Sequence, residues 1–152
     1  MNIITDPYIR FMRARDLAQV MALERRTFNK AWSRVLFRYS LMQCGVVGYV
    51  YCGEDRSEVL GFMITMSKKK AIRIINFAVI EDARRMGIGR KMIEWIKEKI
   101  RNQGRKNLLV IVPETNLGFQ LFLRACGLKA TKVKQGYFHN PEQDAIYFTY
   151  HA

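Results

Sequence analysis

The residues best suited to binding chemistry form the run Arg84-Arg85-Met86-Gly87-Ile88-Gly89-Arg90-Lys91. This run joins an apolar, strand-like segment at 74–80 to an amphipathic segment that begins near Gly87. Two glycines let the backbone approach a ligand without interference from a Cβ atom. The first turn of a helix adds unpaired N–H groups and the positive end of the helix dipole. Because three arginines flank this turn, the run predicts a site for a phosphate-bearing molecule.

Two common phosphate-binding motifs do not fit this run. A dinucleotide fingerprint requires a third glycine three residues after Gly89, where the chain has Met92. A Walker loop requires Gly-Lys followed by Ser or Thr, and this chain has Gly-Arg-Lys. The remaining pattern is Arg-x-x-Gly-x-Gly between a strand and a helix. On its own, this pattern is also compatible with a plain helix-entry turn.

The elements that must position this loop follow from the hydrophobic periodicity. Strands are expected at 9–12, 46–52, 59–65, 71–80, 108–112, 133–135 and 145–150, and helices at 17–28, 35–43, 87–102 and 117–126. Asp16 and Ser33 are expected to cap the first two helices. The order β-α-α-β-β-β-α-β-α-β-β predicts an α/β fold, with a mixed sheet between helices on both faces.

Length and composition fit one folded domain spanning residues 1–152. Hydrophobic residues make up 49% of the chain and aromatic residues 12%, which argues against disorder. No apolar run approaches about 18 residues, and no charged-then-apolar leader opens the chain, so neither a membrane span nor a signal peptide is expected. Three cysteines without metal-ligand spacing predict no disulfide framework, no bound metal and a cytoplasmic location.

The net charge of +13 has two interpretations. One is solubility alone. The other is attraction to polyanions such as CoA, RNA or the ribosome surface, because the cations recur along the whole chain rather than in a tail. Either way, a basic surface disfavours cationic acceptors.

The loop and its neighbours resemble the acetyl-CoA-dependent N-acetyltransferases of the GNAT superfamily, and most closely the bacterial ribosomal-protein alanine N-acetyltransferases (RimI type). Besides the loop, the matching pieces are Asn76-Phe77-Ala78-Val79, Glu114-Thr115-Asn116, Gly127-Leu128 and Gln143-Asp144-Ala145. The segment 28–33 resembles the Phe-Pro-Trp-Ser segment of that family with the proline absent. The order of elements matches as well, so the resemblance covers nearly the whole chain.

The resemblance implies a seven-stranded, mostly antiparallel sheet with about four helices, whose central parallel strands splay apart to hold acetyl-CoA. It assigns Phe77, Ala78 and Val79 to the pantetheine arm, with Val79 near the acetyl carbonyl. It assigns Arg84, Arg85, Met86, Gly87, Ile88, Gly89 and Arg90 to the pyrophosphate. Asn116 resembles the asparagine that contacts the arm, and it is equally suited to capping the helix at 117.

The chain departs from the family where protons are moved. The usual glutamate base falls at Ile111 and the usual tyrosine acid at Leu123. Glu114, which is expected at the end of a strand, and Tyr137, which is expected in a hairpin, are the candidate replacements. His139 is a weaker candidate. Glu24 is expected to be surface charge, with a small chance of gripping an α-ammonium.

A missing base favours one class of acceptor. An α-amine with a pKa near 8 costs about 1.4 kcal/mol to deprotonate at pH 7, whereas a lysine amine costs about 4.6 kcal/mol. We therefore expect direct acetylation of a protein N-terminus, with Cys126 buried rather than nucleophilic. Two alternatives stay open, namely another amine such as aminoacyl-tRNA, and a degenerate module that only binds acyl-CoA.

Overall fold

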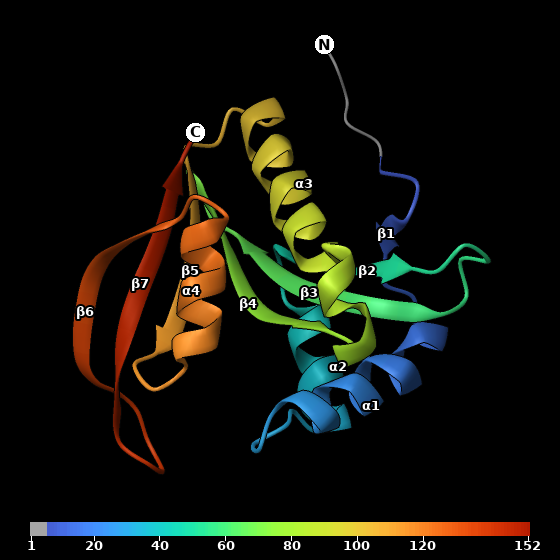
Figure 1. Ribbon diagram of the computed structural model, residues 1–152, viewed down its shortest axis with the longest axis horizontal. Helices are drawn as coiled ribbons and strands as arrows, with labels where there is room; N and C mark the ends of the chain where they lie inside the picture. Colours follow the sequence, from blue (N-terminus) through green and yellow to red (C-terminus); the bar gives the residue numbers. More distant parts are fainter. Residues whose placement is uncertain (1–5) are drawn as a thin grey trace.

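The computed structural model describes residues 6–152, except for the side chain of Arg85. Within this range the chain forms seven strands, four α-helices and two short 3-10 turns (Figure 1). The strands are β1 (Ile9–Phe11), β2 (Val46–Cys52), β3 (Val59–Ser67), β4 (Ala71–Val79), β5 (Asn107–Pro113), β6 (Lys129–Phe138) and β7 (Gln143–His151). The helices are α1 (Leu17–Thr27), α2 (Arg34–Met42), α3 (Ile88–Asn102) and α4 (Leu117–Ala125), and the 3-10 turns are η1 (Ala14–Asp16) and η2 (Glu81–Met86). The predicted order of strands and α-helices is confirmed.

All seven strands form one sheet in the order β1-β2-β3-β4-β5-β7-β6. Every pairing is antiparallel except that of β4 with β5. One hydrophobic core packs α1 and α2 against β2–β4, and a second packs α3 and α4 against the opposite face (Figure 1). The predicted mixed, mostly antiparallel α/β fold is therefore confirmed.

The parallel pair β4–β5 is the structural origin of the site. The two strands pair only from Ala71 with Asn107 to Ile74 with Val110, and they diverge beyond that point. The β3–β4 register shifts at the same level, because Ile64 pairs with Asn76 while Thr65 pairs with Ile74. Ile75 is thus an extra residue in β4, and such a bulge bends and twists its strand. The expected splay between central strands is confirmed.

Local sequence explains most element boundaries. The Ser33 side chain accepts a hydrogen bond from the Leu36 N–H (3.1 Å), as predicted for the cap of α2. The apolar stripe of α3 is buried, and β5 alternates half-buried with buried residues. Gly104, two residues after α3, has φ of +66°, which suits a glycine just past a helix end.

Some expectations on local structure were wrong. The Asp16 side chain does not cap α1. Its carboxylate instead accepts hydrogen bonds from Nη1 and Nη2 of Arg10 (2.7 and 2.8 Å) and from the Arg13 N–H. Strand β6 is also longer than predicted, because its residues 129–135 are mostly polar and all exposed and so show no buried alternation. No helix within residues 6–152 is long and apolar enough to cross a membrane.

Candidate active site

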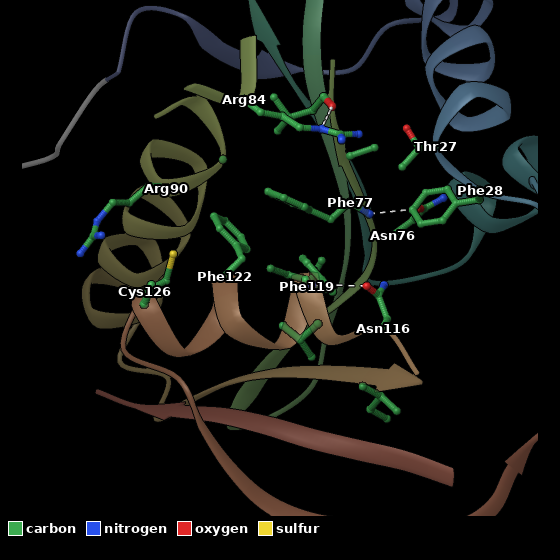
Figure 2. Close-up of a pocket in the computed structure, with 18 of the residues that line it drawn as sticks. Thr27, Phe28, Asn76, Phe77, Arg84, Arg90, Asn116, Phe119, Phe122 and Cys126 are labelled. Carbon is green, nitrogen blue, oxygen red and sulfur yellow. Dashed lines mark hydrogen bonds between the residues drawn. The ribbon is translucent and has the colours of Figure 1, made fainter. Parts of the chain in front are cut away.

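A cleft of about 790 Å³ opens where β4 and β5 part (Figure 2). Eight of the residues expected to bind a cofactor line it: Phe77, Ala78 and Val79 from β4, Arg84, Gly87, Gly89 and Arg90 from the loop and α3, and Asn116 at the start of α4. Met86 is exposed and Ile88 is buried in the core, so neither side chain is part of the lining. The Arg85 side chain lies outside the described part of the chain.

The edge of β4 presents backbone groups to the cleft. Ile80 donates its N–H to the Leu60 carbonyl, and Ala78 pairs with Phe62. Because residues of an antiparallel pair alternate in bonding to their partner strand, Phe77 and Val79 turn their backbone groups away from β3 and into the cleft.

Two of these backbone groups bond to side chains of the chain itself. The Phe77 N–H donates to Asn76 Oδ1 (2.8 Å), and the Val79 carbonyl accepts from Arg84 Nε (3.2 Å), as Figure 2 shows. The Val79 N–H and the Phe77 carbonyl are the backbone groups that this edge offers to a ligand.

The loop between β4 and α3 has the features of an anion-binding site. Gly87 has φ of +72°, a conformation that side chains disfavour, and a Cβ at this position would meet nothing within 4 Å. The first hydrogen bond of α3 runs from the Lys91 N–H to the Gly87 carbonyl (3.0 Å), so the N–H groups before Lys91 have no acceptor within the helix. The first turn has no acidic residue, and Arg84 and Arg90 lie at the cleft. These features fit a pyrophosphate.

Gly89 is required for packing as well as for ligand approach. A Cβ at this position would lie 3.1 and 3.3 Å from ring atoms of Phe122 and 3.6 Å from the Phe77 ring. Phe77, Phe119 and Phe122 stack mutually, with ring centroids 5.8 to 5.9 Å apart, along the cleft wall. The sequence analysis did not single out Phe119 or Phe122. Phe119 and Phe122 follow Asn116 by three and six residues, and this spacing along α4 was the available signal.

Asn116 caps α4 as expected, and its contact with the cofactor arm stays a prediction. Its side chain accepts a hydrogen bond from the Phe119 N–H (3.3 Å), which caps α4, and the residue also lines the cleft (Figure 2).

Glu24 was expected to be surface charge, and this expectation was wrong. The residue is 1% exposed. Burial raises the pKa of its carboxyl, and this effect outweighs the hydrogen bonds that the carboxyl accepts, which lower the pKa. These bonds come from the Trp32 N–H (3.0 Å) and from Asn76 Nδ2 (2.8 Å). Through Asn76, Glu24 is linked to the Phe77 N–H at the cleft. It therefore ties α1, the loop before α2 and the splayed part of β4 together.

The candidate proton-transfer groups lie outside the cleft lining. Glu114 is exposed, and its carboxylate accepts from the Asp144 N–H (3.1 Å). The Tyr137 hydroxyl accepts from Arg73 Nη2 (3.2 Å), and His139 is exposed. Cys126 lines the cleft but is 2% exposed, and burial raises the pKa of its thiol, which disfavours the nucleophilic thiolate.

The two positions where the chain departs from the resembled family are both apolar in their surroundings. Ile111 lines the cleft, and Leu123 is fully buried in the core beneath α4. Neither position places a titratable group near the cleft.

Known proteins are similar to this chain in sequence pattern and in fold. Residues 17–128 match the model of the acetyltransferase (GNAT) family. Among curated proteins, no sequence matches this chain. Similar solved structures include the ribosomal-protein-S18-alanine N-acetyltransferase of Escherichia coli (TM-score 0.81, 20% identity, 94% of this chain and 92% of that chain).

Ard1 of Thermoplasma volcanium is similar too (TM-score 0.81, 20% identity, 95% of this chain and 96% of that chain). NAA60 of Arabidopsis thaliana in complex with acetyl-CoA is also similar (TM-score 0.78, 14% identity, covering 94% of this chain and 97% of that chain). At these identities, the likeness to the solved structures identifies a common fold.

Proposed function

Because this chain belongs to the acetyltransferase (GNAT) family, whose co-substrate is acetyl-CoA, we propose that it acetylates the α-amine of a protein N-terminus. One observation carries the choice of acceptor. Of the described residues that line the cleft, only Arg84, Arg90 and Cys126 have titratable side chains. No carboxylate, histidine, tyrosine or lysine among these residues is in place to take a proton from an incoming ammonium group.

A cleft without a base selects for an amine that is already partly neutral. At pH 7 roughly one-tenth of an α-amine is in its neutral form. The neutral fraction of a lysine amine is smaller by a further factor of more than about a hundred. One solved structure of similar fold is a ribosomal-protein-S18-alanine N-acetyltransferase. This similarity supports the proposal of an α-amine acceptor.

The chain's own groups have separable roles in this proposal. Acetyl-CoA supplies a thioester that the amine can attack directly. Its phosphates are held by the first turn of α3 together with Arg84 and Arg90. The Val79 N–H is the donor available to the thioester oxygen. The amine nitrogen bonds to the carbonyl carbon as the carbon–sulfur bond breaks, and the amine proton passes to water. Cys126 takes no part, because its buried thiol stays protonated.

The departing thiolate still needs a proton. Tyr137 is our candidate for the acid, since its oxygen accepts from Arg73 and keeps its own O–H free to donate. Glu114 is our candidate for relaying the amine proton through water, from its exposed position at the end of β5. Both roles predict altered pH–rate profiles in Tyr137→Phe and Glu114→Gln. Unaltered profiles in both variants would reject these roles.

The test of the acceptor compares two peptide sets with labelled acetyl-CoA. One set has a free N-terminus and no lysine, and the other has a blocked N-terminus and one lysine. We expect kcat/KM to favour the first set by more than about a hundredfold at pH 7. Equal rates, or faster labelling of lysine, would overturn the proposal. Binding of acetyl-CoA without transfer to any acceptor would instead identify a module that only binds the cofactor.

The second candidate acceptor is an amine carried by RNA, such as aminoacyl-tRNA, and the net charge of +13 is the observation that favours it. The same charge is compatible with action near the ribosome. We also propose a cytoplasmic location, where free cysteines such as these three stay reduced. Addition of ribosomes and aminoacyl-tRNA to the labelling assay, followed by mass spectrometry, separates RNA-linked from protein N-terminal products.

A further inference from the structure

One face of the sheet is open beside the cleft. Ile72, Ile74, Val110 and Phe148 face the core beneath α3 and α4. Because side chains alternate along strands, Arg73, Ile111 and Tyr147 lie on the opposite face. In the described residues, the core beneath α1 and α2 includes β2–β4 but no residue of β5, β6 or β7. In Figure 1, β6 and β7 lie at the side of the sheet away from α1 and α2.

Arg73 is the unusual residue of this open face. It is half-buried, and its Nη2 donates to the Tyr137 hydroxyl (3.2 Å). Its Nε is buried and has no hydrogen-bond partner among the described residues. None of the ion pairs formed within residues 6–152 includes Arg73. A buried donor without a partner is unfavourable, so this guanidinium keeps hydrogen-bonding capacity that an anion could use.

The surroundings of Arg73 are also basic. Lys132 lies over the ring of Tyr147 (5.2 Å to the centroid), and Lys134 over the ring of Tyr137 (5.5 Å). Among the carboxylates at this end of the sheet, Glu114 accepts a hydrogen bond from the Asp144 N–H and Asp144 accepts one from the Gly136 N–H, while Glu142 is exposed in the β6–β7 turn. None of the ion pairs within the described residues includes Arg73, Lys132 or Lys134.

The position of Arg73 relates it to the acceptor rather than to the cofactor. Arg73 pairs with Leu109, and the next pair, Ile74 with Val110, is the last one before β4 and β5 diverge. Ile111, on the same face, lines the cleft and pairs with Tyr147, whose ring packs edge-on against Tyr137. The anion-binding first turn of α3 belongs to the other face, where α3 and α4 pack. An amine that enters the cleft from the open face therefore brings the residues behind it towards Arg73 and Tyr137.

We propose that Arg73, steadied by Tyr137, binds a carboxylate within the first three residues of the acceptor, so that the protein prefers acidic N-termini. This proposal rests on the proposed function, since it assumes a peptide acceptor. The planar guanidinium fork matches a carboxylate in two parallel hydrogen bonds, and a half-recessed fork suits a short acidic side chain. The exposed lysines nearby add long-range attraction for the same acidic segment.

The test uses peptides that differ only by Glu or Gln at position 1, 2 or 3. For the native protein, we expect kcat/KM to favour Glu by about tenfold or more in at least one position. Arg73→Gln should abolish this preference, so that Glu and Gln peptides are acetylated with equal kcat/KM, and Arg73→Lys should restore the preference in part. Lys69→Gln, at the exposed β3–β4 turn, removes the same charge elsewhere and should keep the preference. Thermal unfolding checks that each variant is folded.

The outcomes separate this proposal from the one on which it rests. Acetylation of all peptides without preference for Glu would overturn the carboxylate site and leave the proposed function standing. If no peptide is acetylated, anisotropy of the same labelled peptides with the CoA-saturated protein decides. Binding of Glu peptides that Arg73→Gln abolishes would support the site alone, and no such binding would reject both. Preference for an aminoacylated RNA minihelix over acidic peptides, if Arg73→Gln removes it, would assign the guanidinium to phosphate and overturn the proposal.

Discussion

At the scale of single residues, Glu24 is the side chain that most constrains the site without lining it. Both of its oxygens accept hydrogen bonds, one from the Trp32 N–H and one from Asn76 Nδ2, and Asn76 in turn accepts from the Phe77 N–H. A carboxylate is the only natural side chain of this size that accepts at both ends, because an amide would turn an NH₂ group towards one of the two donors. Glu24 therefore holds the orientation of the Asn76 amide and, through it, the edge of β4.

Glu24→Gln tests this role. We expect a loss of about 1–3 kcal/mol in the free energy of unfolding, because one buried donor loses its partner. The loss should be accompanied by a lower kcat/KM for acetyl-CoA, since Asn76 lies at the cleft. Chemical denaturation and steady-state kinetics measure the two effects. Glu54→Gln, on the exposed β2–β3 turn, is the control and should change neither.

The pH dependence of stability gives the same substitution a second readout. Burial raises the pKa of Glu24 in the folded protein, so the folded state binds a proton more readily than the unfolded chain. This contribution to stability is fully present below the unfolded pKa of about 4.3 and is lost as pH rises through the folded value. The cost of Glu24→Gln should thus be larger in mild acid than at neutral pH. A cost that shrinks on acidification would contradict the burial of this carboxyl.

At the scale of elements, the connection from β4 through η2 to α3 does two tasks with two glycines. Gly87 supplies a left-handed residue with open space around it, and Gly89 lets α3 approach the Phe122 ring. An effect of a Gly89 substitution would therefore mix lost packing with lost ligand binding. Gly87 is the cleaner position for testing the anion site.

The pair Gly87→Asn and Gly87→Asp isolates the charge. Both side chains tolerate φ of +72° better than other non-glycine residues do, and they differ mainly in one negative charge. We expect Gly87→Asp to weaken acetyl-CoA binding about tenfold relative to Gly87→Asn, because it places an anion at the positive end of α3. Isothermal titration calorimetry with CoA measures the difference. Equal affinities in the two folded variants would reject the loop as the phosphate site.

Several elements could be read from the sequence because their signals are local. Ser33 precedes a helical pattern that it caps, and the nearly all-apolar strand β5 is typical of a central strand. The environment of Glu24 could not be read, because its partner Asn76 is 52 residues away and is brought near only by the fold. The stacking of the Phe77 ring on the phenylalanines of α4 and the unpaired Nε of Arg73 were missed for the same reason. They depend on contacts between elements rather than on spacing within one.

At the scale of the whole molecule, the sheet separates two approaches to one cleft. The turn that we propose for phosphate binding lies with α3 and α4 on one face, and Arg73 and Tyr147 lie on the other. Two substrates can therefore occupy the cleft together, which direct transfer of an acetyl group requires. The net charge of +13 acts on both, since the cofactor is an anion and our proposed acceptor carries a carboxylate.

The contribution of this charge to cofactor binding can be measured with a truncated thioester. Salt screens the attraction between exposed charges over a Debye length that falls from about 30 Å at 0.01 M to about 8 Å at 0.15 M. We expect the KM for acetyl-CoA to rise severalfold over this range, whereas the KM for S-acetyl-pantetheine, which lacks the phosphates, should stay nearly constant. A neutral acceptor peptide keeps the second substrate out of the comparison. If both thioesters respond equally to salt, the charge acts on the protein or on the acceptor rather than at the turn before α3, and the basic surface must be explained by its macromolecular partner.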